Sequence, residues 1–413
     1  MSKKAKHRLD SSDSWVRKLC RVLVGDRLLS TPWALVLIVL GAGVASLISI
    51  NRAKLLPDQF ESDAKLILKF ARNETDEGGS FRTIANLYQS LHLVDQPTLA
   101  GLFGVFLAAC LAALIVYRVG GIRCNVVAIT VLLLYLVFSG VFFGTYTKEV
   151  IVLMALIVAA SLASQWGTDL VLVGVLALVG ASFRPYWAFI AAIYLVVRFV
   201  PLKFKRIRFI IPMMILFNIG SSLVIWFTLN KPADFFRSSV NEPRVHTGEA
   251  NTIIVRFISD LAEPVGGVVN NLLTMFSLMV PVPLLGRGGL YYVFIVLVFV
   301  LIWVAFVLAV RSRPDREQVL ASRGVALFAS FAVVQGLFEP DYGSALRHLC
   351  PLIPFIFLIW QPVLSKNDSE NESGEVEDKN NEDESSAREG EAERTDSNSV
   401  LSLTPLEERT SDT

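Results

Sequence analysis

Long apolar runs, separated by short polar stretches, dominate the first 364 residues of the chain. A helix crosses a hydrocarbon core about 30 Å thick with about 20 residues, each adding 1.5 Å. The apolar runs meet or approach this length and are nearly free of charge. They predict ten transmembrane helices, at 31–50, 98–117, 125–143, 150–165, 169–183, 186–200, 208–229, 290–310, 324–338 and 349–364. The expected fold class is therefore all-α, a polytopic helical membrane protein.

One further apolar stretch, residues 265–285, is long enough to be considered as a span. Asn270 and Asn271 interrupt it, and Pro281 and Pro283 stand near its end. These residues suit a re-entrant or interfacial segment, which is tolerated where it lines a protein cavity. Counting the stretch as a span would also move a later basic loop to the outer side. We therefore predict that it does not cross.

Composition and charge agree with a membrane protein and distinguish the acidic end of the chain from the rest. Apolar residues make up 53% of the sequence and charged residues 18%, against about 25% charged residues in soluble domains. From Lys366 onward there are 16 acidic and 5 basic residues, a net charge of −11. Such a segment buries too little apolar surface to fold. Residues 365–413 are therefore expected to form a disordered, acidic cytoplasmic tail that activity does not require.

Basic residues fix the expected orientation, because Lys and Arg gather in cytoplasmic loops. Residues 1–30 are strongly basic, and so are the stretches "RVGGIRC", "RFVPLKFKRIR" and "RSRPDREQVLASR". Ten spans place all four on the same side, so both termini are expected to be cytoplasmic. The transmembrane domain is then 31–364, with two large outer segments at 51–97 and 230–289.

Four charged stretches fall on the outer face in this topology. They are "FESDAK" (60–65), "YTKE" (146–149), "FRPYW" (183–187) and "EPDYGSALRH" (339–348). An ionisable side chain near membrane depth is costly and normally faces a cavity with partners. The alternative for each one alone is a charge that reaches out to interfacial water, or a helix cap in the case of Glu149. Four such stretches on one face favour a common site.

The residue types in these stretches suggest what the site binds. Arginine bonds phosphate oxygens through a planar fork and lysine adds a point charge, so Arg184, Arg347 and Lys148 suit an anionic group such as diphosphate. The predicted substrate-binding residues also include Glu149 and His348. A nearby carboxylate can take a proton from an attacking hydroxyl. The candidates for this catalytic role are Glu339, Asp341, Asp63 and Glu61. The sequence contains no zinc-protease, P-loop, nucleophile-elbow or dinucleotide motif, and we expect neither a metal nor a cofactor.

Taken in order along the chain, several short motifs resemble the repeat-unit polymerases of O-antigen, capsule and exopolysaccharide pathways, the Wzy-like family. The resemblance covers roughly 31–364. It rests on Phe60-Glu61-Ser62-Asp63, Thr147-Lys148-Glu149, Arg184-Pro185, Pro281-Val282-Pro283, and Arg347-His348 with the prolines up to Pro354. Glu61 stands where the family more usually has Asp, and the acidic tail is not part of the family pattern.

The resemblance implies a metal-independent glycosyltransferase of the cytoplasmic (inner) membrane. It would transfer a growing glycan from polyprenyl diphosphate to a sugar hydroxyl of a second lipid-linked repeat unit at the outer face. The implied partners are polyprenyl-diphosphate-linked oligosaccharide, the lipid bilayer and other polysaccharide-assembly proteins, without nucleic acid. Two alternatives stay open. A flippase or transporter of the same lipid would carry charges within its spans and often internal repeats, and a non-enzymatic assembly protein would need no outer charge cluster.

Overall fold

The computed structural model describes residues 28–75, 79–163, 165–199, 207–247, 252–312 and 319–360. Helices make up about four-fifths of these residues. Two three-residue strands, β1 (Leu28–Ser30) and β2 (Gly121–Arg123), form an antiparallel pair in which Leu29 lies opposite Ile122. The acidic tail and all but the end of the basic N-terminal region lie outside the described residues.

Six described helices are long and apolar enough to cross a membrane, and they coincide with six of the predicted spans. They are α2 (Thr31–Ile50), α6 (Pro97–Val119), α7 (Val126–Phe138) with the π-helical turn η2 (Ser139–Phe143), α11 (Ile207–Leu229), α15 (Leu290–Arg311) and α16 (Val319–Phe338). The all-α, multi-pass membrane class is thereby confirmed. The full count of ten spans stays a prediction.

Three of the remaining predicted spans form shorter apolar helices. They are α8 (Glu149–Ser161), α9 (Trp166–Ser182) and α10 (Tyr186–Phe199), with 13, 17 and 14 residues. At 1.5 Å per residue a helix of 13 residues rises about 20 Å, less than the thickness of a hydrocarbon core. The residues at the ends of these helices are therefore held close to the bundle. They include Glu149 and Arg184, which are described below.

The last predicted span, 349–364, is not one continuous helix in the described residues. The chain instead forms α17 (Tyr342–Leu349), a 3₁₀ turn η4 (Cys350–Leu352) and α18 (Phe355–Ile359). Pro351 and Pro354 explain the breaks, because proline lacks the backbone N–H and its ring clashes with the preceding helical turn. All residues from Cys350 to Trp360 are buried, so this broken segment lies inside the protein.

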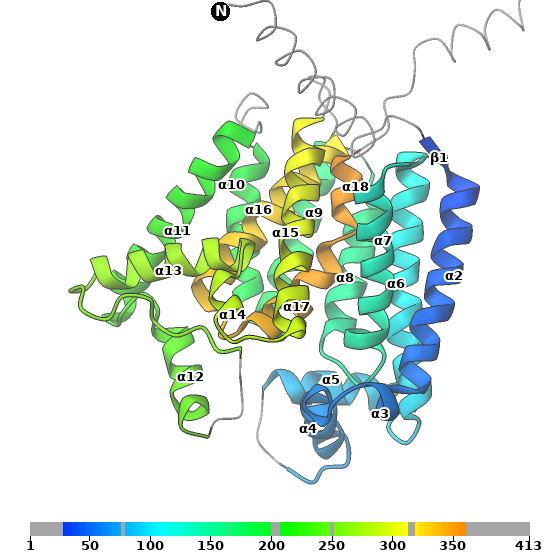
Figure 1. The fold of residues 1–413 in the computed structure, drawn as a ribbon, viewed down its shortest axis with the longest axis horizontal. Coiled ribbons are helices and arrows are strands. Elements are labelled where there is room, and N and C mark those ends of the chain that lie inside the picture. The colour runs from blue at the N-terminus through cyan, green and yellow to red at the C-terminus, as the bar shows by residue number, and fades with distance from the viewer. Residues whose placement is uncertain are drawn as a thin grey trace, which may run out of the picture. The chain divides into compact units, whose positions relative to one another are not determined.

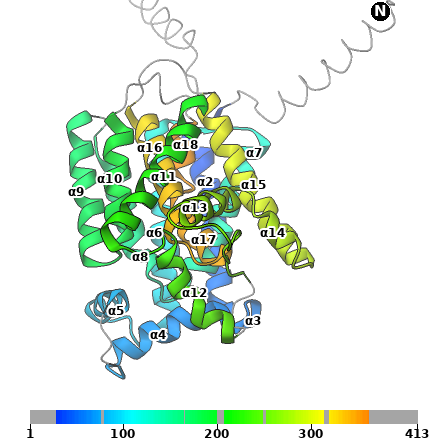
Figure 2. The same cartoon turned by 90° about the vertical axis from the view of Figure 1, so that its left-hand side faces the viewer.

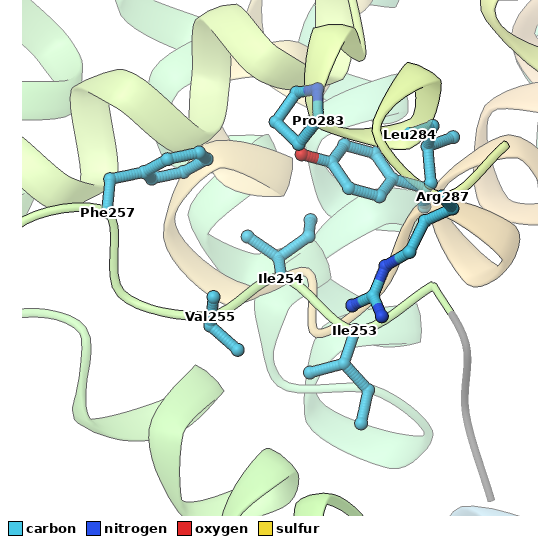
Figure 3. Close-up of a pocket in the computed structure, with 8 residues that line it drawn as sticks. Ile253, Ile254, Val255, Phe257, Pro283, Leu284 and Arg287 are labelled. Atoms are coloured by element: carbon cyan, nitrogen blue, oxygen red, sulfur yellow. The ribbon is translucent and has the colours of Figure 1, made fainter. Parts of the chain in front are cut away.

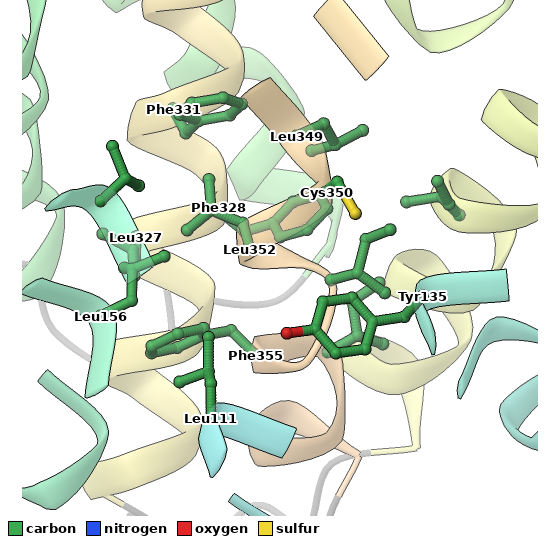
Figure 4. Packing of buried hydrophobic residues seen from close by; sticks show 14 of the residues in the cluster. Leu111, Tyr135, Leu156, Leu327, Phe328, Phe331, Leu349, Cys350, Leu352 and Phe355 are labelled. Carbon is green, nitrogen blue, oxygen red and sulfur yellow. The ribbon is translucent and has the colours of Figure 1, made fainter. Parts of the chain in front are cut away.

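Helix α16 forms the centre of the core. It packs against α10, α11, α13 (Val265–Met279) and α18, and the apolar window of this helix is buried along its whole length. Figure 4 shows Phe328 and Phe331 of α16 among side chains from α6, α7, α8 and the broken segment. The rings of Phe328 and Phe306 stack with centroids 4.7 Å apart. Helix α16 is therefore held in place by the helices that surround it.

Helix α13, from the stretch predicted not to cross, lies across the bundle. It runs crosswise to α2, α6 and α15 in Figure 1 and is seen nearly end-on in Figure 2. Its two asparagines are buried, and Asn270 Nδ2 donates to the carbonyls of Ile258 and Gly266, each 2.8 Å away. This transverse placement accords with a segment that does not cross, and its position in the membrane stays a prediction.

The first predicted outer segment folds at one end of the bundle. It forms α3 (Arg52–Leu55), the 3₁₀ helix η1 (Asp58–Glu61), α4 (Ser62–Ala71) and α5 (Ser80–Ser90). These elements and α12 (Phe235–Thr247), from the second outer segment, lie at the end opposite β1 (Figure 1). The short helix α14 (Val282–Leu285) precedes α15.

Candidate functional site

The four charged stretches that the sequence places on one face come together in the structure. Five parts of the chain supply them: the first turn of α4, the start of α8, the turn between α9 and α10, the residue after α16, and the last turn of α17. The ion pairs and close contacts described below join Asp63, Lys148, Glu149, Arg184, Glu339, Arg347 and His348. We call these seven residues the outer cluster.

Glu149 is the centre of the outer cluster. It opens α8 and is 1% exposed, and Arg184 Nη2 lies 3.0 Å from its Oε1. Arg184 Nη1 also donates to the hydroxyl of Tyr186 at 2.7 Å. His348 Nε2 and Arg347 Nε approach the same Glu149 oxygen at 3.6 and 4.0 Å. A buried charge pair is tolerated when further polar partners surround it, and Glu149 has three cationic or polar neighbours.

Glu339 and His348 form a second buried pair beside it. His348 Nδ1 lies 2.9 Å from Glu339 Oε2, and Ser344 donates its hydroxyl to Glu339 Oε1. Ser344 and His348 are four residues apart in α17 and so share one face of the helix. Burial raises the pKa of Glu339 to about 8 even though the Ser344 hydrogen bond opposes the shift. Burial, helped by Arg184, lowers the pKa of His348 to about 3.

These two shifts describe where protons reside. At neutral pH most of the Glu339 carboxyl is protonated and the His348 imidazole is uncharged. Glu339 can then donate its proton to Nδ1, which leaves the imidazole N–H on Nε2, facing Glu149. Glu339 and His348 are therefore joined by a hydrogen bond, and the Nε2 of His348 faces Glu149 at 3.6 Å, beyond hydrogen-bond distance.

Asp63 joins the two remaining cations. Its Oδ2 lies 2.7 Å from Arg347 Nη1 and 3.8 Å from Lys148 Nζ. Burial would raise the pKa of Asp63, but Arg347 and Lys148 together hold it below its usual value. Lys148 also lies over the ring of Phe81, 3.8 Å from its centroid. Burial and the nearby Arg184 lower the pKa of Lys148 to about 8.

Two of the predicted catalytic carboxylates have other partners. Glu61 pairs with Arg52, which also donates to the carbonyl of Phe60 at 3.0 Å. Asp341 caps α17 by accepting the backbone N–H of Ser344 at 2.8 Å. The other Asp341 oxygen lies 3.0 Å from Arg244. Glu61 and Asp341 thus have local partners, whereas Asp63 and Glu339 belong to the outer cluster, and the catalytic role of each carboxylate stays a prediction.

Arg347 does not form its ion pair with the carboxylates that lie nearest to it in the sequence. A pairing with Glu339 or Asp341 would have joined Arg347 to its own connecting loop. The guanidinium instead contacts Asp63, which belongs to the outer segment between the first two spans. Sequence proximity is misleading here because Asp341 is engaged in capping α17 and in pairing with Arg244.

Three residues of the site were not singled out from the sequence. Tyr186 follows Arg184 within a quoted stretch, and a hydroxyl two residues from an arginine was a usable signal. Ser344 lies between the charged residues of α17, where the four-residue spacing to His348 indicates a shared face. Phe81 gave no signal, because only the packing of α4 against α5 brings it beneath Lys148.

A second buried ionic cluster lies among the ends of α8, α9, α10 and α16. Asp169 is fully buried, with Arg198 Nη2 2.7 Å and Arg323 Nε 2.8 Å from its carboxylate and the Tyr194 hydroxyl at 2.9 Å. Arg323 also donates to the carbonyls of Ala159, Leu162 and Ala163. Its donors are therefore engaged by protein, and we interpret this cluster as a structural junction of four helices.

An apolar hollow lies next to the start of α17. It is lined by Ile253, Ile254, Val255, Phe257, Pro283, Leu284, Arg287 and Tyr342. Figure 3 shows the Arg287 guanidinium reaching from the α14 side toward Ile253 and Ile254. The lining is mostly hydrocarbon and includes no carboxylate or histidine.

The chain matches no protein-family model, no curated protein and no solved structure. The fold and the apolar helices define its class as an all-α, multi-pass membrane protein. Its outer cluster consists of three basic residues, three carboxyl groups and a histidine.

Proposed function

We propose that the chain polymerises lipid-linked oligosaccharide repeat units for surface polysaccharide assembly, by glycosyl transfer from polyprenyl diphosphate at the outer face of the membrane. The observation that carries this proposal is the convergence of Arg184, Arg347 and Lys148 beside the Glu339–His348 pair. Cations that bind phosphate thus stand next to groups that can move a proton, which is the combination that glycosyl transfer from a diphosphate needs.

Each part of the reaction has a candidate residue. The acceptor hydroxyl oxygen forms a bond to the anomeric carbon of the donor, and the bond from that carbon to the phosphate oxygen breaks. Arg347 and Lys148 stabilise the negative charge that develops on the departing polyprenyl diphosphate. The hydroxyl proton passes to Glu339, whose pKa of about 8 is close to the operating pH, as general base catalysis favours.

Arg184 has a different place in this scheme. Its side chain is 7% exposed and is held by both Glu149 and Tyr186, whereas about a quarter of the Arg347 side chain is exposed. Arg347 is therefore the better direct contact for phosphate. Arg184 keeps Glu149 ionised and adds positive potential to the site.

The test is to replace Arg347 and Arg184 singly by Gln and to measure both membrane abundance and lipid-linked glycan. Losing a charge-assisted bond to phosphate costs about 1.5 to 3 kcal/mol, or about tenfold to a hundredfold in rate if it is made in the transition state. We expect shortened polymer and accumulation of single repeat units outside the membrane at normal protein abundance.

Arg72→Gln is the matched control, since Arg72 lies at the same end of the bundle and pairs with the exposed Asp95 at 3.3 Å. It should leave polymer length unchanged. Normal polymer from stable Arg347→Gln and Arg184→Gln proteins would refute the proposed site. Single repeat units accumulating on the inner side would instead favour a flippase.

A further inference from the structure

Asp63 holds an unusual position for a carboxylate in a cluster that is proposed to bind anions. Its Oδ2 lies 2.7 Å from Arg347 Nη1 and 3.8 Å from Lys148 Nζ. These two cations come from α17 and from the start of α8, whereas Asp63 comes from α4 in the outer segment. One carboxylate from a separate element therefore occupies the side of both cations that a phosphate oxygen would take.

The position of Asp63 determines the net charge of the outer cluster. Lys148, Arg184 and Arg347 face the carboxylates of Glu149 and Asp63, while Glu339 is mostly protonated at neutral pH because its pKa is about 8. The cluster thus carries a net charge of about +1 with Asp63 in place and about +2 when Asp63 is withdrawn. A diphosphate esterified at both ends carries about two negative charges, which matches the cluster without Asp63.

The exposure of the Asp63 side chain allows its carboxylate to move away from Arg347 and Lys148. About 27% of its side chain is exposed, against 2% for Glu149. Asp63 lies in the first turn of α4, and the apolar face of α4 is held by Ala64 and Ile67, which are buried in the main core. The carboxylate can therefore turn toward solvent while the helix stays packed.

We propose that Asp63 is an exchangeable occupant of the anion site, so that phosphate oxygens bind Arg347 and Lys148 by replacing its carboxylate. This inference deepens the proposed function and rests on its assignment of Arg347 and Lys148 to phosphate. Asp63 is then an internal competitor rather than a catalytic base. It neutralises charge on Arg347 and Lys148 and lowers the affinity of every anion that needs them.

Two other roles for Asp63 make different predictions for Asp63→Asn. If Asp63 positions Arg347 and Lys148 for the ligand, removing its charge weakens anion binding. If Asp63 stays in place and only repels the ligand, removing its charge strengthens binding more for a highly charged anion than for a singly charged one. If Asp63 exchanges, the affinity of each anion rises by the same factor, because that factor is the reciprocal of the fraction of wild-type molecules in which the site is open.

The experiment is titration calorimetry on the full chain in non-ionic detergent and phosphate-free buffer, with inorganic pyrophosphate and dimethyl phosphate as probes. A partly exposed ion pair is weak, so we expect Asp63→Asn to tighten both probes by about fivefold to tenfold. Asp58→Asn is the control, because Asp58 is an exposed carboxylate of η1 in the same segment. It should leave both affinities unchanged.

Every outcome decides between these roles. An equal gain for the two probes supports exchange. Weaker or unchanged binding, or a gain that grows with probe charge, overturns it and leaves the polymerase assignment standing. Failure of both proteins to bind either probe overturns the exchange and the phosphate site together. If Asp63→Asn does not fold, as judged by thermal unfolding, Asp63→Ala is measured under the same criteria.

Discussion

Glu339→Gln is the substitution that most directly tests the proposed chemistry. Glutamine has the shape of a protonated glutamic acid and is uncharged, so it replaces the form of Glu339 that dominates at neutral pH. The hydrogen bond from Ser344 and the contact with His348 can both persist. The variant should therefore fold, while losing the ability to accept a proton.

The raised pKa gives the expected pH dependence of the wild-type protein. With a pKa of about 8, the ionised fraction of Glu339 is about 1% at pH 6, about 9% at pH 7 and about half at pH 8. If this carboxylate accepts the hydroxyl proton, the rate of polymer formation should rise about fiftyfold between pH 6 and pH 8. Glu339→Gln should be slow at both values and should lose this dependence.

The same pKa has a consequence for stability with a defined sign. The Glu339 pKa is raised above its unfolded value of about 4.5, so its contribution to stability is complete below that value and is lost as the pH rises through 8. Between pH 6 and pH 8 the loss is on the order of 2 to 3 kcal/mol. Between pH 6 and pH 8 the unfolding temperature of the wild-type protein in detergent should therefore decrease. The unfolding temperature of Glu339→Gln should lack this decrease.

The assay is glycan chain extension from lipid-linked repeat units by purified protein in vesicles, at several pH values. Glu74→Gln serves as the control, since Glu74 is an exposed glutamate at the same end of the bundle. It should reproduce the wild-type profile. A flat wild-type profile between pH 6 and pH 8, or a slope that survives in Glu339→Gln, would refute the role of Glu339 as the base.

Three further predictions follow from other parts of the structure. Arg347→Lys keeps the charge but not the planar fork, so it should restore only part of the activity that Arg347→Gln loses, as measured by polymer length at equal abundance. Arg323→Met leaves Asp169 short of a partner in a fully buried cluster and should cost about 3 to 5 kcal/mol, seen as a lower unfolding temperature with normal activity per folded molecule. The predicted topology requires that the exposed Cys124 reacts with a membrane-impermeant thiol reagent only after permeabilisation, whereas Asp58→Cys reacts in intact cells. Labelling of Cys124 from outside would overturn that orientation.

The helical framework was predictable because hydrocarbon-length apolar runs have few alternative structures. The boundaries of α2, α6 and α15 differ from the predicted spans by at most two residues. The break in the last segment was indicated by Pro351 and Pro354, but its high hydropathy was interpreted as one span. Apolar character alone does not distinguish a helix that faces lipid from a broken segment buried in protein, and in this chain the prolines were the better guide.

The outer cluster was predictable as a set of stretches but not as a set of contacts. Lysine and arginine bias placed Lys148, Arg184 and Arg347 on one face. The pairing of Arg347 with Asp63 depends on how α4 packs, and sequence pattern carries no information on that packing. Arg323 was attributed to a basic loop, whereas it lies inside α16 and pairs with Asp169, 154 residues away.

Helix α16 links the two ionic clusters mechanically. Arg323 lies near its start and Glu339 follows its last residue, so about 24 Å of continuous helix separates them. A carrier that opens alternately to the two sides of a membrane has to shift its helices relative to one another in each cycle. Here such a shift would have to break the bonds of Arg323 to Asp169 and to three carbonyls, or carry α8, α9 and α10 along as one body. If the outer cluster is the working site, as proposed, these bonds would keep its face in a constant shape, and substrates would enter and leave from the side where the outer cluster lies.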